Sequence, residues 1–150
     1  MRIFAFQFDA LLKLRRHRRD LCRQLLAQVL ASDRELIAQR EDLERARLGQ
    51  LGELRELGRE GEVDVDRTAT RRYYAGQLAG RSHAVERNRE LVTRQLLLCR
   101  QALAESDRDV KVLEKLEERE KAAFRYAEER HEARELEDAW RGTRRREVFG

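Results

Sequence analysis

The chain has 150 residues, of which 41% are charged and 6% aromatic, with no proline and a formal net charge of +4. This composition argues against an ordinary globular domain, because few large apolar side chains are present to build a thick core. Very long helices are permitted, since each interior proline would cost roughly 3 kcal/mol of helix stability. The 33 basic side chains are answered by 29 acidic ones, unlike the basic clusters typical of strong nucleic-acid binders.

The chain opens with MRIFAFQFDALLKLRR, in which phenylalanines alternate with other residues. Gln7 and Asp9 interrupt the apolar run within a few residues, so we expect neither a signal peptide nor a transmembrane span. The alternating Phe4, Phe6 and Phe8 either cap the seam of a helix pair or anchor the chain in a partner's pocket. The sequence leaves both interpretations open.

Apolar residues spaced by multiples of seven predict a first helix over about residues 9–57. This stripe contains Phe8, Cys22, Val29, Leu36, Leu43 and Leu57, with Leu11, Leu25 and Ala46 three positions further on. Polar residues share the stripe, namely Arg15, Arg18, Ser32, Gln39 and Gln50. The predicted seam of this helix is therefore imperfect.

Four glycines follow closely along the chain, at positions 49, 52, 58 and 61, and the heptad pattern lapses after them. Glycine inside a helix costs about 1 kcal/mol, so the cluster predicts a chain reversal over about residues 58–67. Either Asp66 or Thr68 is expected to be the N-cap of the second helix.

A more regular heptad pattern predicts a second helix over about residues 68–140, followed by a flexible tail at 141–150. Its seam contains Leu78, Val85, Val92, Leu96, Cys99, Leu103, Ser106, Val110 and Leu113. The alternating spacing of three and four residues is that of a left-handed coiled coil. We therefore expect an all-α fold, an antiparallel two-helix coiled-coil hairpin with unequal arms, forming a single domain over residues 1–150.

The unequal arms predict that the second helix extends past its partner. If the reversal centres between residues 60 and 66, the numbers of paired residues sum to about 120–132. The helix that begins at Asp9 then ends opposite about residue 111–123, where the overhang of the second helix begins. Three attractive pairs spaced by four residues could support it: Glu117 with Lys121, Arg125 with Glu129, and Arg134 with Asp138. Like-charge pairs at the same spacing offset these small contributions, so a helix this exposed is best explained by a partner that encloses it.

No pattern of residues typical of an enzyme is present. His17, His83 and His131 lie far apart without a second ligand at metal-binding spacing, and no phosphate-binding loop occurs. We expect no catalytic residues, no metal and no cofactor. Cys22 and Cys99 are too few for a disulfide framework, which favours a reducing, cytoplasmic location and two small hydrophobic seam residues over a redox pair.

Two other groups of residues remain. RRHRR at 15–19 and RRR at 144–146 are either solvated helix surface or a site for phosphate groups, so an alternative function is a basic coiled-coil binder of nucleic acid or anionic membrane. Tyr73 and Tyr74, followed by Leu78, either pack within the hairpin or form a docking site near its turn.

The two ends of the chain resemble the flagellar export protein FliJ. That family opens with alternating phenylalanines and a leucine-rich first turn, as in FAFQFDALLKLRR, and later carries an L-x-x-L-x-E-R stretch and a charged segment ending in Leu and acidic residues. Leu113, Leu116, Glu118 and Arg119 match the stretch. Leu136, Glu137 and Asp138 match the ending, whereas Trp140 and RGTRRREVFG match no feature of the family.

The resemblance implies a non-enzymatic coiled-coil stalk of the flagellar type III export apparatus. Such proteins are cytoplasmic, peripheral at the inner membrane through their partners, insert their terminal ends into the hexameric export ATPase, contact the membrane-embedded export gate and handle export chaperones. No nucleic acid is implied. The stalk protein of an injectisome is a close alternative.

The resemblance also nominates residues for two contacts. The residues that it implies for the ATPase are Phe6, Phe8, Leu11, Leu12, Leu113, Leu116, Glu118, Arg119, Leu136 and Asp138. For the export gate the candidates are Tyr73, Tyr74 and Leu78.

Overall fold

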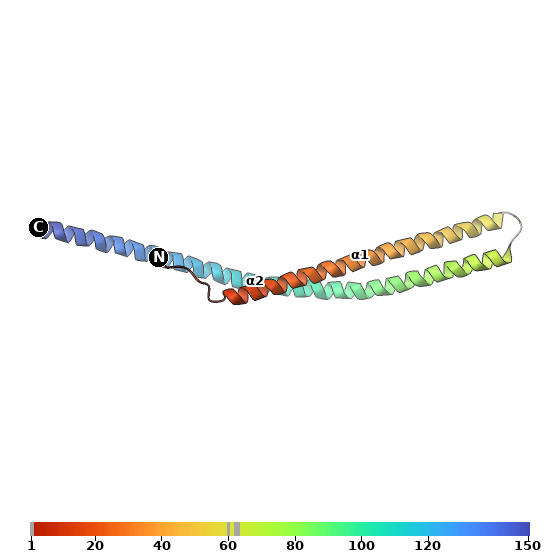
Figure 1. Cartoon of the computed structure of the whole chain (residues 1–150), viewed down its shortest axis with the longest axis horizontal. Helices are drawn as coiled ribbons and strands as arrows, with labels where there is room; N and C mark the ends of the chain where they lie inside the picture. Colours follow the sequence, from red (N-terminus) through yellow and green to blue (C-terminus); the bar gives the residue numbers. More distant parts are fainter. Residues whose placement is uncertain (1, 60, 62–63) are drawn as a thin grey trace. The chain divides into compact units, whose positions relative to one another are not determined.

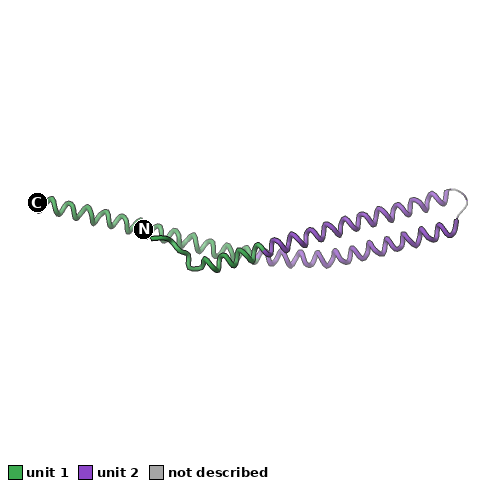
Figure 2. Tube along the Cα trace, in the orientation of Figure 1, with its two compact units in different colours: residues 1–20, 105–150 green, residues 21–104 purple. Residues whose placement is uncertain are grey.

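A computed structural model describes residues 2–59, 61 and 64–150 of the protein. Two long helices, α1 (Asp9–Arg59) and α2 (Val65–Phe149), account for nearly all of these residues (Figure 1). The chain divides into two compact units, one of Met1–Asp20 with Glu105–Gly150 and one of Leu21–Ala104 (Figure 2). Each unit is described by itself below, and the single domain expected from the sequence stays a prediction.

In the unit of Leu21–Ala104, α1 and α2 run antiparallel and pack against each other (Figure 2). Val29, Leu96 and Cys99 form a buried cluster, which Leu26, Leu30 and Val92 extend. Three ion pairs join the two helices among the described residues of this unit: Arg89 Nε lies 3.1 Å from Asp33 Oδ1, Arg40 Nη1 lies 2.9 Å from Glu86 Oε2, and Arg71 pairs with Glu53. The paired residue numbers sum to 122, 126 and 124. The predicted all-α, antiparallel hairpin is confirmed.

The unit of Met1–Asp20 with Glu105–Gly150 holds a second small core. Phe6, Leu12 and Val110 are buried together, and the half-buried Phe4, Leu113 and Leu116 pack against them. Arg15 Nη1 lies 3.3 Å from Asp109 Oδ2, and Arg16 Nη2 lies 3.2 Å from Glu114 Oε1. The first three turns of α1 are thus fixed to α2 by both apolar and ionic contacts.

The seam of α2 follows the predicted heptads. Leu78, Val85, Leu96, Cys99, Ser106 and Val110 are buried, and Val92, Leu103 and Leu113 are half-buried. Since these positions alternate by three and four residues, one stripe of α2 faces α1 within each unit. The serine at position 106 is only 3% exposed, so a polar residue occupies this stripe without breaking it.

The seam of α1 differs from its prediction in one of its two rows. Cys22, Val29, Leu36, Leu43 and Leu57 lie in the seam as predicted. Phe8, also predicted there, precedes α1 and is exposed, as are Leu11, Leu25 and Ala46. The second row lies one residue later and contains Leu12, Arg19, Leu26, Asp33, Arg40, Arg47 and Leu54. Leucines stand next to each other at 11–12 and at 25–26, so either residue of each pair could have belonged to the seam. In the structure the second leucine of each pair packs there.

The chain reversal lies between Arg59 and Val65, and residues 60, 62 and 63 of the predicted turn lie outside the described residues. Gly61 has a φ of 76°, a left-handed conformation that favours glycine. Asp64 is the N-cap of α2, because its Oδ1 accepts hydrogen bonds from the backbone N–H groups of Asp66 and Arg67 at 3.1 and 3.2 Å. The predicted caps, Asp66 and Thr68, lie inside the first turn instead.

Helix α2 continues to Phe149, through residues for which the sequence predicted a flexible tail. No proline stops the helix, and the single glycine at 142 costs only about 1 kcal/mol. None of the helices in the described part of the chain is both long and apolar enough to span a membrane.

Candidate partner-binding surfaces

Two of the alternating phenylalanines of the N-terminal segment, Phe4 and Phe6, pack on α2. Phe6 is buried, whereas Phe8 is 38% exposed, and their ring centroids are 5.8 Å apart in an edge-to-face arrangement. The Phe4 ring lies 5.7 Å from that of Phe124, and Lys121 Nζ lies 6.0 Å from the Phe4 centroid. Phe4 and Phe6 therefore cap the seam, and Phe8 is the one that offers ring surface to a partner.

The residues nominated for the ATPase divide into two groups. Phe6 and Leu12 are core residues, and the half-buried Leu113 and Leu116 pack against that core. A partner can reach the remaining ones without opening the core. These exposed residues, named the terminal surface below, are Phe8, Leu11, Glu118, Arg119, Leu136 and Asp138.

The last part of α2 has no packing partner among the described residues, and every side chain from residue 129 to 150 is exposed. Large apolar groups lie on this bare helix, with exposed fractions of 72% for Leu136 and 61% for Trp140. Burying such groups against another surface would be favourable by roughly 25 cal/mol for each Å² of apolar area. The overhang therefore offers surface that a partner could cover.

Ion pairs along α2 do little to hold this part of the helix. Of the three predicted attractive pairs, only Lys121 with Glu117 forms among the described residues, at 3.3 Å between Nζ and Oε1. His131 Nδ1 also lies 3.4 Å from Glu135 Oε1. Exposed pairs of this kind are worth a few tenths of a kcal/mol each. The unpaired helix thus depends mainly on its backbone hydrogen bonds and on side-chain propensity.

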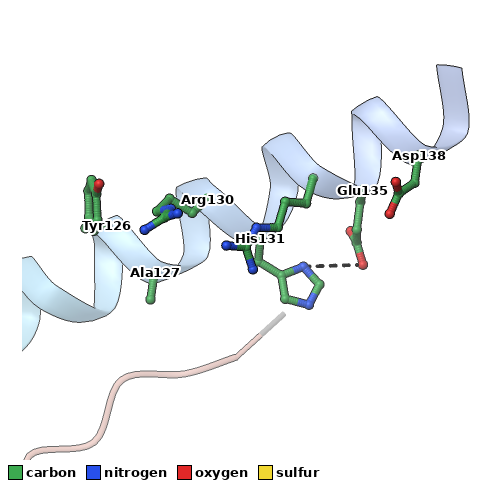
Figure 3. Close-up of a pocket in the computed structure, with 7 residues that line it drawn as sticks. Tyr126, Ala127, Arg130, His131, Glu135 and Asp138 are labelled. Atoms are coloured by element: carbon green, nitrogen blue, oxygen red, sulfur yellow. Dashed lines mark ion pairs between the residues drawn. The ribbon is translucent and has the colours of Figure 1, made fainter. Parts of the chain in front are cut away.

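A shallow hollow on this overhang was missed by the sequence interpretation. It is lined by Tyr126, Ala127, Arg130, His131, Arg134, Glu135 and Asp138 (Figure 3). The guanidinium carbon of Arg130 lies 5.6 Å from the Tyr126 ring centroid, a cation–π arrangement. The signal that could have found it is the spacing of four residues from Tyr126 through Asp138, which places these side chains in one row.

The candidates near the turn lie on the unit of Leu21–Ala104. Tyr73 and Tyr74 are 69% and 45% exposed, whereas Leu78 is buried at 4%. Gln77 Nε2 donates a hydrogen bond of 2.9 Å to the Tyr73 hydroxyl. The two tyrosines can thus contact a partner directly, whereas Leu78 is buried in the seam and cannot.

The basic RRHRR segment is partly neutralised by acids of α2. Arg15 and Arg16 pair with Asp109 and Glu114, as described above.

Elsewhere on α1, hydrogen bonds from Arg47 hold the pKa of Glu44 below its usual range. The described residues contain no group of three or more His, Cys, Asp or Glu side chains placed to hold a metal ion. The charged side chains of α1 thus form ion pairs with α2 and with one another.

Comparison with known proteins gives one clear match. The sequence pattern of the family described as Flagellar FliJ protein matches residues 4–147. None of the curated proteins and none of the solved structures gives a significant match. The match covers both helices and the N-terminal phenylalanines, so the resemblance at the two ends extends over nearly the whole chain. The chain belongs to the flagellar FliJ protein family.

Proposed function

We propose that this protein is a non-catalytic stalk of the flagellar export apparatus, and that its terminal surface enters the ring of the hexameric export ATPase. Its membership of the FliJ family makes it an export-related coiled-coil protein. The observation that carries the ATPase contact is the bare end of α2, where every side chain from residue 129 onward is exposed. A ring can surround the helix at Leu136 and Asp138, which are both exposed, whereas a single docking groove covers only one face of a helix.

The proposal separates contact residues from supporting residues. Leu136 and Asp138 on the overhang, together with Phe8 and Leu11, would touch the ATPase. The buried Phe6 and Leu12 would hold the N-terminal segment against α2. Loss of a supporting residue would reduce binding only through loss of structure.

Leu136 provides the direct test, because its side chain is 72% exposed and makes no core contact. The Leu136→Asp variant should lose most of its capture by the cognate export ATPase in a pull-down with the purified full chain. Leu91→Asp is the matched control, since Leu91 is an exposed leucine of the same helix in the other unit, at 56%. Circular dichroism should show equal helix content in both variants.

A chain truncated after residue 128 adds a second test. It keeps the ion pairs and the ring contact described above between the N-terminal part of the chain and α2, as well as the hydrogen bond of 3.4 Å that Gln7 Nε2 donates to Glu120 Oε1. It removes only the bare helix. Weak or absent capture by the ATPase is expected. Full capture of this truncated chain, or equal capture of the Leu136→Asp variant and the wild type, would contradict the proposal.

The proposal also includes a gate contact through Tyr73 and Tyr74, and the handling of export chaperones. Replacing both exposed tyrosines by serine should weaken capture by the cytoplasmic part of the export gate and leave ATPase capture unchanged. Unchanged gate binding would show that the two tyrosines do not form this contact.

The protein would be cytoplasmic and peripheral at the inner membrane. The flagellar description of the matching family favours a role in the flagellar export apparatus over the injectisome alternative.

A further inference from the structure

The last three turns of α2 carry a surface that the proposed function does not use. Positions spaced by four residues form rows along a helix, and two adjacent rows here hold Trp140, Arg144 and Val148, and Arg141, Arg145 and Phe149. All six side chains are exposed, and they line one shallow hollow together with Asp138 and Gly142. This set of six residues is called the basic–aromatic face.

The cations of this face are available to a ligand. Arg141, Arg144 and Arg145 form no ion pair with any residue that the structure describes, in contrast to Arg15 and Arg16 of the RRHRR segment. Residues 139–150 contain four arginines and a single acid, Glu147. The guanidinium carbon of Arg144 lies 4.9 Å from the Trp140 ring centroid. Positive charge is thus concentrated here and held close to an indole ring.

The apolar members of the face are even more exposed than its tryptophan. Val148 is 74% exposed and Phe149 is 87% exposed, against 61% for Trp140. Indole and phenyl rings favour the boundary between headgroups and acyl chains, and arginines beside them pair with lipid phosphates. Since no described helix could cross a membrane, a contact of this kind would lie at the bilayer surface.

We propose that the basic–aromatic face binds the surface of an anionic phospholipid bilayer directly. Arg141, Arg144 and Arg145 would pair with headgroup phosphates, while Trp140 and Val148 enter the boundary with the acyl chains. This contact goes beyond the proposed function, because it requires neither the ATPase nor the export gate.

The geometry favours a lipid surface over a nucleic acid. Single-stranded nucleic acids stack successive bases on neighbouring aromatic rings. Trp140 and Phe149 are nine residues apart, which is roughly 13 Å along the helix, and arginines and a valine lie between them. A fluid bilayer imposes no such spacing on the rings.

The test uses the fluorescence of Trp140, the only tryptophan of the chain. The full-length protein is mixed with vesicles of phosphatidylglycerol and phosphatidylethanolamine, or with vesicles of phosphatidylcholine alone. We expect a blue shift of the emission and co-sedimentation with the anionic vesicles only, both weakening as salt rises. An Arg144→Glu/Arg145→Glu variant should bind at least about tenfold more weakly, because each cation near an anionic surface contributes appreciably.

The charge-matched control is Arg130→Glu/Arg134→Glu, which changes the net charge equally on the same bare helix. This control should keep most of the binding. Absence of binding to anionic vesicles, equal binding to neutral vesicles, or equal loss in both double variants would overturn the proposal. So would a blue shift with a single-stranded oligonucleotide but none with vesicles, since that outcome would assign the face to nucleic acid.

Discussion

Two stretches of α2 both carry many charged side chains but lie in different environments. Between residues 75 and 110 the helix buries Leu78, Leu96 and Val110 along one stripe, whereas every side chain from residue 129 to 150 is exposed. Both stretches carry many charges, although the exposed stretch is the more highly charged, with 12 charged residues in 22 against 11 in 36. The difference lies in whether apolar residues recur at heptad spacing, which determines where α2 gains a partner within its own chain. Charge keeps a helix soluble, and the apolar stripe determines what it pairs with.

The largest expected effect comes from replacing a leucine of the small core by alanine, and it is compared with the same replacement on the bare helix. Leu12 is 1% exposed in the small core, and Leu12→Ala should lower the free energy of unfolding by about 2–5 kcal/mol, because it leaves a cavity. Leu136 is 72% exposed, and Leu136→Ala should change it by less than about 0.5 kcal/mol. Urea denaturation followed by circular dichroism measures both. Similar losses would mean that the bare helix also packs on the chain.

A smaller effect is expected from the charged layer of the paired region. The side chains of Asp33 and Arg89 are only 18% and 24% exposed. Asp33→Ala should cost about 1–3 kcal/mol, since it leaves the guanidinium of Arg89 in the seam with only a 4.0 Å contact to Glu86.

Two further variants show whether the seam position is responsible. The double variant Asp33→Leu/Arg89→Leu should restore or exceed wild-type stability, because apolar residues can fill the same space. Asp42→Ala breaks an exposed pair with Arg45 and should cost less than about 1 kcal/mol. Thermal denaturation compares all four proteins. A double variant less stable than Asp33→Ala would show that the ion pair itself stabilises the seam.

The smallest effect concerns the reversal that creates the paired region. Gly61 has positive φ, so Gly61→Ala should cost about 1–2 kcal/mol. Gly58 lies inside α1, and a Cβ there would meet no atom within 4 Å. Gly58→Ala should therefore stabilise the protein by about 0.5–1 kcal/mol. Opposite signs in chemical denaturation are expected, and equal signs would contradict the assigned turn.

Sequence periodicity predicted the fold well where apolar residues stand alone. In α2 the seam was predicted correctly, because residues such as Val85 and Val110 have polar or small neighbours. In α1 two leucine pairs, at 11–12 and 25–26, left the register of one row undecided. The charged seam residues were hidden for a different reason: periodicity counts apolar residues only, so Asp33 could not be recognised before its partner Arg89 was placed beside it.

The candidate surfaces were predictable only in part. Family-like motifs identify residues by type and spacing, but they do not separate a core phenylalanine such as Phe6 from a more exposed one such as Phe8. That distinction depends on how the N-terminal segment folds back onto α2. The hollow around Arg130 was missed because only Asp138 of its lining residues belongs to the motif, although their spacing was visible.

The Asp33–Arg89 pair has a mechanical consequence. In an antiparallel pair whose seams are apolar throughout, one helix could slide against the other by a heptad, about 10 Å, and still match leucine with leucine. Here such a slip would move Arg89 either to Arg40, a like charge, or to Leu26, an apolar residue that cannot satisfy it. This one charged layer therefore obstructs sliding of the two helices in both directions.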